Sequence, residues 1–155
     1  MGRDLGAGLH GYDAVALGDR IVTGSRQVTR DLIAAFGDLT LDHFEIHESD
    51  AGAARHGFAA QVAHGLLVLS LIDGLKNQSA AQFHAMASLG WDWEFRKPVY
   101  AQDTIRAEME VTGKRPTSKP DRAVLTIKVS VFNQHGAIVQ RGTNRLMAYR
   151  SDKRL

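Results

Sequence analysis

"HGLLVLSLIDGL", residues 64–75, carries seven large apolar side chains in twelve positions. Wound at 3.6 residues per turn, these side chains spread around the whole circumference of a helix. A helix that is apolar on every side is expected to be enclosed by other structure. Because each fully buried leucine contributes about 1.5–3 kcal/mol to folding, this segment is predicted to be the central helix of the core.

The sequence after this helix changes to a period of two. Apolar and polar residues alternate in "AMASLGWDWEFRKPV" (85–99), "TIRAEMEV" (104–111) and "RAVLTIKVSVF" (122–132), and a fourth such segment near 137–149 follows the turn sequence "NQHG". This alternation predicts antiparallel strands with one apolar face each. The economical assembly is an α+β fold in which a curved antiparallel sheet wraps around the apolar helix.

The chain reads as one domain, residues 14–150, between two terminal segments. Residues 1–13 are expected to be flexible, and residues 151–155 form a basic tail. Ahead of the central helix, "TRDLIAAFGDL" (29–39) predicts a short helix that Thr29 can cap.

Composition excludes several classes of function. The chain of 155 residues has no cysteine, which rules out disulfides and thiol nucleophiles, and its net charge of +2 is too small to indicate a nucleic-acid partner. Its longest apolar run, residues 66–72, is too short to cross a membrane, and no signal peptide is recognisable. We therefore expect a cytoplasmic protein. The basic segment 113–122 is expected to be solvated, with contact to a phosphate-bearing ligand as the alternative.

"TLDHFEIHESD", residues 40–50, concentrates two histidines and four carboxylates. In a bent loop, Asp42 and His47 can converge, and such a pair can deprotonate a water and return a proton later. Ordinary loop hydrogen bonds are the alternative. His43 and His47 have i, i+4 spacing, but the glutamate does not follow the first histidine as zinc proteases require, so no metal is predicted.

Gly65 opens the predicted central helix, directly after His64. The first amides of a helix have no partner within the helix, and a glycine lets a ligand oxygen approach them closely. That is the geometry of an oxyanion hole. The alternatives are that Gly65 only allows close packing and that His64 is a packed or capping side chain. Together with Asp42 and His47, this amide suits a reaction that forms an enolate from a thioester.

The chain resembles the MaoC-like dehydratase family, which contains (R)-specific enoyl-CoA hydratases. The resemblance rests on "FGDLTLDHFEIHESDAGAARHGF", "QVAHGLLVLSLIDGL", "WDWEFRKPVYAQDTIRAEMEV" and "VFNQHGAIVQRGTNRLMAYR", and it spans about residues 15–150. It implies a hot-dog fold, a homodimer or higher homo-oligomer, and hydration of a 2-enoyl thioester in fatty acid metabolism. The thioester carrier would be CoA or an acyl carrier protein, without a further cofactor. It also implies that Asp42 and His47 are catalytic and that Gly65, with His64, binds the thioester oxygen.

The active-site loop departs from the family pattern Gly-Asp-x-Asn-Pro-x-His-x-Asp. Leu41 replaces the glycine, and Phe44 and Glu45 replace Asn-Pro, so His43 and Glu45 become possible substrate contacts, with a solvent-facing position as the alternative. Asp73, the one carboxylate on the central helix, is a third possible contact and suggests a hot-dog thioesterase as an alternative function. A non-catalytic subunit that binds acyl thioesters is the remaining alternative.

Overall fold

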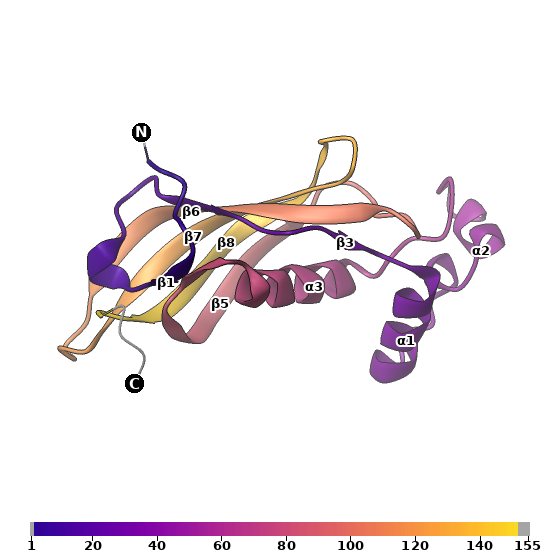
Figure 1. The fold of residues 1–155 in the computed structure, drawn as a ribbon. Helices are drawn as coiled ribbons and strands as arrows, with labels where there is room; N and C mark the ends of the chain where they lie inside the picture. The colour runs from indigo at the N-terminus through magenta and orange to yellow at the C-terminus, as the bar shows by residue number, and fades with distance from the viewer. Residues whose placement is uncertain (1, 152–155) are drawn as a thin grey trace.

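The computed structural model describes residues 2–151, and its main feature is a six-stranded sheet (Figure 1). The strand order is β2-β6-β7-β8-β5, with β3 also pairing with β6, and all of these pairs are antiparallel. The strands are β2 (Arg20–Val22), β3 (Arg26–Gln27), β5 (Ala85–Phe95), β6 (Thr104–Pro116), β7 (Arg122–Phe132) and β8 (Ile138–Tyr149). The four strands predicted from the period-two pattern are therefore confirmed.

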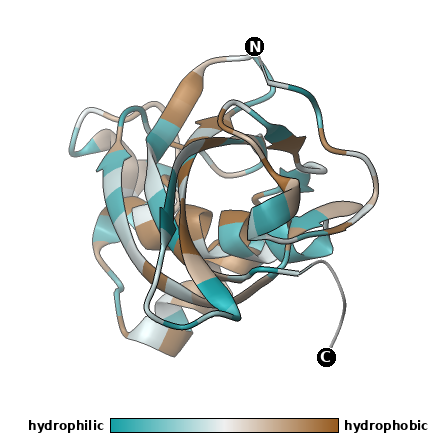
Figure 2. Ribbon diagram, turned by 90° about the vertical axis from the view of Figure 1, so that its left-hand side faces the viewer, coloured by the Kyte–Doolittle hydropathy of each residue, from teal (hydrophilic) through white to brown (hydrophobic). Residues whose placement is uncertain are grey.

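Helix α3 (Gly65–Gln78) lies against the inner face of this sheet, which curves around it (Figures 1 and 2). Leu67, Val68 and Ile72 are buried in the same cluster as Met109 of β6 and Ile127 of β7. The α+β arrangement of an antiparallel sheet wrapped around one long apolar helix is confirmed. Its cause is the match between the apolar faces of the strands and the apolar helix.

One side of α3 is not enclosed, contrary to the expectation from its apolar sequence. Leu66 is 60% exposed. Ser70, Gly74 and Asn77 follow on the same side and are also exposed. The sheet ends at β5, so within residues 2–151 no further strand reaches around to this side of the helix. The apolar residues beyond the sheet edge therefore lie at the surface of the single chain.

Two helices and a 3-10 turn lie together past the end of the sheet, next to the start of α3 (Figure 1). Helix α1 (Arg30–Thr40) begins as predicted, because the Thr29 side chain accepts a hydrogen bond from the amide of Leu32. The 3-10 turn η2 (Glu45–His47) and helix α2 (Asp50–Ala54) follow it. These elements hold the loop that contains both predicted catalytic residues.

The start of the chain is tied to the domain by backbone hydrogen bonds. Strand β1 (Gly8–His10) pairs in parallel with β4 (Ala81–Phe83), and the 3-10 turn η1 (Tyr12–Ala14) follows. The sequence predicted a flexible segment at residues 1–13, but residues 8–10 of it are paired with β4. This pairing uses backbone N–H and C=O groups, which leave no pattern of side chains in the sequence. The predicted basic tail begins at Ser151, and residues 152–155 lie outside the described residues.

Two findings bear on possible partners. None of the helices within residues 2–151 combines the length and apolar character needed to cross a bilayer. The basic segment 113–122 forms the end of β6 and the turn into β7, at the end of the molecule opposite α1 (Figure 1).

Candidate active site

The loop after α1 brings Asp42 and His47 together, as the sequence predicts. Helix α1 ends at Leu41, which has a left-handed backbone (φ 65°) and turns the chain back toward the helix. His47 then lies in η2, with its Nε2 3.9 Å from Asp42 Oδ2. The His47 side chain is 10% exposed, whereas about half of the Asp42 side chain is open to solvent. A shielded imidazole therefore faces an accessible carboxylate.

Burial and one hydrogen bond fix the protonation of His47. Its Nδ1 lies 2.7 Å from the carbonyl oxygen of Val62, which can only accept, so Nδ1 carries the proton and Nε2 keeps its lone pair. Burial of the ring lowers the pKa of His47 below the ordinary 6.5 and outweighs the opposing hydrogen bond to Val62. A neutral imidazole whose basic nitrogen points toward Asp42 is suited to act as a general base.

His64 supports both members of this pair from beneath. Its ring stacks on His47 with centroids 3.8 Å apart and planes 22° apart, and its Nε2 donates to the backbone oxygen of Asp42 at 2.9 Å. Phe36 packs edge-on against the same ring. His64 is buried, and its Nδ1 has no hydrogen-bond partner among the described residues. The geometry gives His64 a supporting contact with the pair, while its predicted contact with substrate stays a prediction.

Gly65 and His47 line one cavity of about 300 Å³, and Asp42 lies beside His47. The lining comes from η2, the loop before α3, the start of α3, the end of β5 and β8, and includes His47, Val62, Gly65, Phe95 and Gln140. A β-carbon at position 65 would lie 2.7–2.8 Å from the Phe95 ring, so only glycine fits without displacing that ring. The predicted role of Gly65 rests on its position, because it opens a helix and lines the cavity that also contains the imidazole.

Gln140, which the sequence analysis did not single out, anchors this side of the cavity. Its Nε2 donates to the backbone oxygen of Gly65 at 3.1 Å, and its Oε1 accepts from Trp93 Nε1 at 2.9 Å. Gln140 is almost fully buried. The sequence did contain an indication of this role. Gln140 and Asn144 lie on the same face of β8 as the buried Leu146, and polar residues buried on such a face are expected to hydrogen-bond to other groups.

The other predicted contacts do not line this cavity. His43 Nδ1 lies 2.8 Å from Glu48, and this hydrogen bond raises the pKa of His43. Glu45 is held at 2.6 Å by both Arg55 and His56, and the hydrogen bond from Arg55 is the main cause that lowers the pKa of Glu45 to about 2. Both side chains are thus engaged in surface networks.

Asp73 lies eight residues after Gly65 on α3 and lines a different pocket. The rise of a helix places it about 12 Å from the opening of α3.

Three groups of the site could also hold a metal ion. Ligand atoms of Asp42, His47 and His64 lie within 4.8 Å of one another. The hydrogen bonds to Val62 and Asp42 engage one nitrogen of each histidine, which leaves His47 Nε2 and His64 Nδ1 as potential ligands. The expectation of a metal-free site therefore stays a prediction.

The sequence profile of the MaoC like domain matches residues 14–132. The chain belongs to the MaoC-like dehydratase family. The (R)-specific enoyl-CoA hydratase of Aeromonas caviae is 34% identical over 110 residues, which cover 71% of this chain and 78% of that relative.

Solved structures agree with this family assignment. The MaoC-like dehydratase from Rhodospirillum rubrum superimposes with a TM-score of 0.83 at 25% identity, covering 91% of this chain and 97% of the other. The R-hydratase of Pseudomonas aeruginosa gives a TM-score of 0.77 at 25% identity, covering 91% and 86%. The hot-dog fold that the sequence resemblance implied for this MaoC-like chain is confirmed.

Proposed function

We propose that this MaoC-like protein is a hydro-lyase that reversibly hydrates a 2-enoyl thioester to the 3-hydroxyacyl thioester. The observation that carries the proposal is a cavity lined by both His47 and Gly65, with Asp42 beside His47. Asp42 and His47 offer two proton acceptors 3.9 Å apart, and the opening amide of α3 at Gly65 lies on the cavity that His47 lines. An enoyl-CoA hydratase among the relatives supports the same reaction class.

The first step is attack of water on C3. One water at hydrogen-bond distance, about 2.8 Å, can donate to both Asp42 Oδ2 and His47 Nε2 and direct its lone pair at the substrate. As the C3–O bond forms, the neutral imidazole accepts a proton, and the C2–C3 π electrons move toward the thioester carbonyl. The pair thus supplies general-base catalysis, typically a factor of about 10²–10⁴ in rate.

The second step protonates C2. Negative charge on the thioester oxygen is stabilised by the Gly65 amide, whose partner-free N–H lies at the positive end of the α3 dipole. The Asp42–His47 pair then delivers to C2 a proton equivalent to the one taken from water, which restores its starting state. Dehydration of a 3-hydroxyacyl thioester follows the same steps in reverse, and neither direction requires a further cofactor.

The carrier is proposed to be CoA or an acyl carrier protein. Arg96 and Lys97 line the same cavity as His47 and Gly65 and bring cationic groups to it. Phosphate groups pair well with such side chains, and both carriers present phosphates beyond the thioester. We also retain the cytoplasm as the expected location.

We propose further that the chain forms a homodimer. Strand β5 ends the sheet, and large apolar side chains beside it are exposed: Leu66, Leu89 and Phe95. An unpaired edge next to apolar side chains is covered in most proteins. Sedimentation equilibrium should give twice the 17.0 kDa chain mass, whereas a monomer at micromolar concentration would contradict the proposal.

The reaction is tested with crotonyl-CoA by following the loss of enoyl absorbance. Asp42→Asn and His47→Ala should each lower kcat/KM by about two to four orders of magnitude. Asp38→Asn and His56→Ala are matched controls, because these residues pair with His43 and Glu45 rather than with Asp42 or His47, and they should retain activity. Full activity in either Asp42 or His47 variant would refute the assignment.

The thioesterase alternative places an acid near the thioester carbonyl. Asp73 is the acid of α3, and its position about 12 Å along the helix from Gly65 does not suit that role. Release of free CoA thiol from a saturated acyl-CoA, measured with a thiol reagent, would favour the thioesterase. Tight binding of several enoyl-CoA thioesters without turnover of any would favour a non-catalytic binding subunit.

A further inference from the structure

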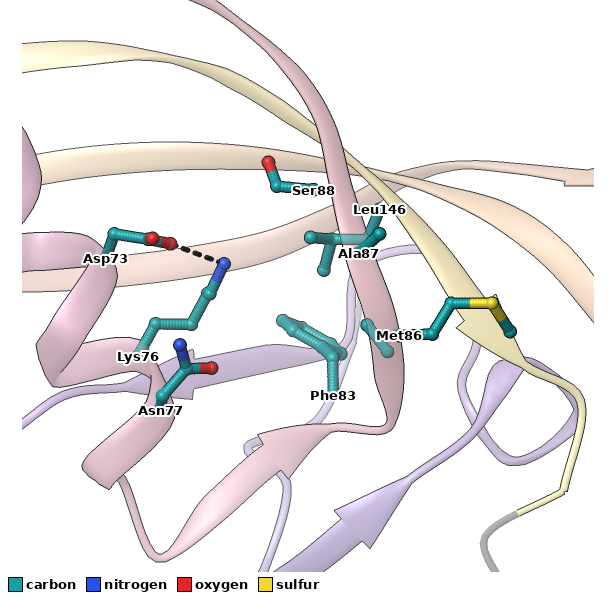
Figure 3. Close-up of a pocket in the computed structure, with 9 residues that line it drawn as sticks. Asp73, Lys76, Asn77, Phe83, Met86, Ala87, Ser88 and Leu146 are labelled. Atoms are coloured by element: carbon teal, nitrogen blue, oxygen red, sulfur yellow. Dashed lines mark ion pairs between the residues drawn. The ribbon is translucent and has the colours of Figure 1, made fainter. Parts of the chain in front are cut away.

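A second pocket lies at the other end of α3 and contains an ion pair (Figure 3). Its volume is about 210 Å³, and its walls come from the last turns of α3, from β4 and from the first half of β5. Asp73 and Lys76 both project from α3 and meet at one wall of the pocket, with Lys76 Nζ 2.7 Å from Asp73 Oδ1. Lys76 is only 8% exposed. The pocket therefore has a polar wall built from a largely buried ammonium group and a carboxylate.

These polar groups are only partly satisfied. Lys76 Nζ lies 3.4 Å from Asn144 Oδ1 and 5.6 Å from the centre of the Trp91 ring. Asp73 Oδ1 is paired with the Lys76 ammonium at 2.7 Å, and the Asp73 side chain is 43% exposed. This wall can accept a further polar group, because a carboxylate accepts at two oxygens and an ammonium has three donors.

This pocket and the candidate active-site cavity share no lining residue, but both lie along α3. Gly65, Leu69 and Asp73 follow one another at four-residue intervals and therefore share one face of α3. Strand β5 borders this face, since the Phe95 ring lies over Gly65 and the Trp91 ring lies over Lys76. This stripe thus has Gly65 at one end, Leu69 in the middle and Asp73 of the ion pair at the other end.

The length of this stripe sets the length of a matching substrate. Eight residues of helix span about 12 Å. An extended chain advances about 1.2 Å per bond, one third of the extended length of a residue. A group about ten bonds from the thioester carbonyl at Gly65 therefore reaches the level of Asp73.

We infer that the Asp73–Lys76 pocket binds the far end of the acyl group, and that the preferred substrate carries a neutral hydrogen-bonding group there, such as a hydroxyl or a ketone. This inference rests on the proposed hydration of a 2-enoyl thioester. An alkyl end would displace water from Asp73 and Lys76 without replacing its hydrogen bonds. A carboxylate end would face Asp73, which already neutralises Lys76. A hydroxyl can donate to Asp73 and accept from Lys76 at once.

The test compares three ten-carbon 2-enoyl-CoA substrates that end in a methyl, a hydroxyl or a carboxylate. The hydroxyl-ended substrate should have a kcat/KM at least about tenfold above that of the methyl-ended one, as expected for hydrogen bonds to charged groups. It should also exceed the carboxylate-ended one. Equal values, or a preference for the methyl or the carboxylate end, would overturn the inference.

The double variant Asp73→Leu with Lys76→Met should remove the preference for the hydroxyl end. The matched control is Asp121→Leu with Arg122→Met, an exposed ion pair at 2.9 Å, and it should keep the preference. If the first double variant does not fold, the order of the three substrates on the unmodified protein still decides. Crotonyl-CoA separates the two proposals: its hydration without any preference among long substrates rejects this inference alone, and no hydration of any substrate rejects the proposed function.

Discussion

Replacing Gly65 by alanine is the most direct test of the opening amide of α3. The added β-carbon would lie 2.7–2.8 Å from three carbons of the Phe95 ring, whereas carbon atoms pack best at about 3.5–4.0 Å. The ring must therefore retreat by about 1 Å. It can do so because Phe95 is 59% exposed. The fold should survive, and alanine within a helix is favoured over glycine by about 0.5–1 kcal/mol.

The effect on catalysis should be much larger than the effect on stability. The new methyl group displaces the Phe95 ring, which lines the same cavity, and so obstructs the approach of the thioester oxygen to the Gly65 amide. Loss of one oxyanion donor typically lowers kcat by about 10²–10³-fold, or about 2.7–4 kcal/mol. We expect a decrease of that size in Gly65→Ala, with an unchanged or slightly higher melting temperature.

Crotonyl-CoA hydration and a thermal melt measure the two effects separately. Gly24→Ala is the control, because a β-carbon there meets no atom within 4 Å, and it should leave activity unchanged. The double variant Gly65→Ala with Phe95→Ala distinguishes the two consequences of the methyl group. Recovery of activity in that variant would show that only the displaced ring matters, and undiminished activity in Gly65→Ala would refute the role of the amide altogether.

Three further predictions concern the surroundings of the site. Because burial lowers the pKa of His47 and its neutral form is the base, kcat/KM for hydration should fall with decreasing pH through a midpoint below 6.5; a midpoint above 6.5 would contradict this. Gln140→Leu leaves Trp93 Nε1 without its acceptor and removes a second donor from the Gly65 carbonyl, so urea unfolding should show a loss of about 1–3 kcal/mol, and unchanged stability would be inconsistent. In Gly52→Ala the β-carbon would collide with the backbone oxygen of Glu45 and displace η2, which carries His47. Crotonyl-CoA turnover should therefore fall about 10²-fold, although Gly52 lies outside the cavity. Normal turnover would show that the position of η2 does not depend on Gly52.

The elements with local signals were predictable from the sequence. The Thr29 cap and the apolar spacing after it determine α1, and strict alternation determines β6 and β7, because both signals act between residues a few positions apart. The convergence of Asp42 and His47 was also predicted, since it needs only one bend within a short loop.

The parts that depend on distant pairing were not predictable from the sequence. Gln140 reaches Gly65 only because β8 pairs with β5 in one register, and that register is set by contacts along both strands. The parallel pairing of β1 with β4 joins segments about seventy residues apart and leaves no local pattern. The exposed side of α3 follows from where the sheet ends, which the composition of the helix cannot reveal.

The left-handed backbone of Leu41 has a consequence for how this loop tolerates change. A side chain in this conformation costs about 1–2 kcal/mol relative to glycine, and with Leu41 80% exposed, packing of its side chain returns little of that. In the unfolded chain, however, leucine samples fewer backbone states than glycine, which offsets about 0.4–1 kcal/mol. Glycine at position 41 would thus leave overall stability unchanged or raise it by up to about 1.5 kcal/mol, while it loosens the backbone directly before Asp42. The glycine of the family pattern suits this left-handed turn, and Leu41 makes the same turn with a residue that restricts the backbone directly before Asp42.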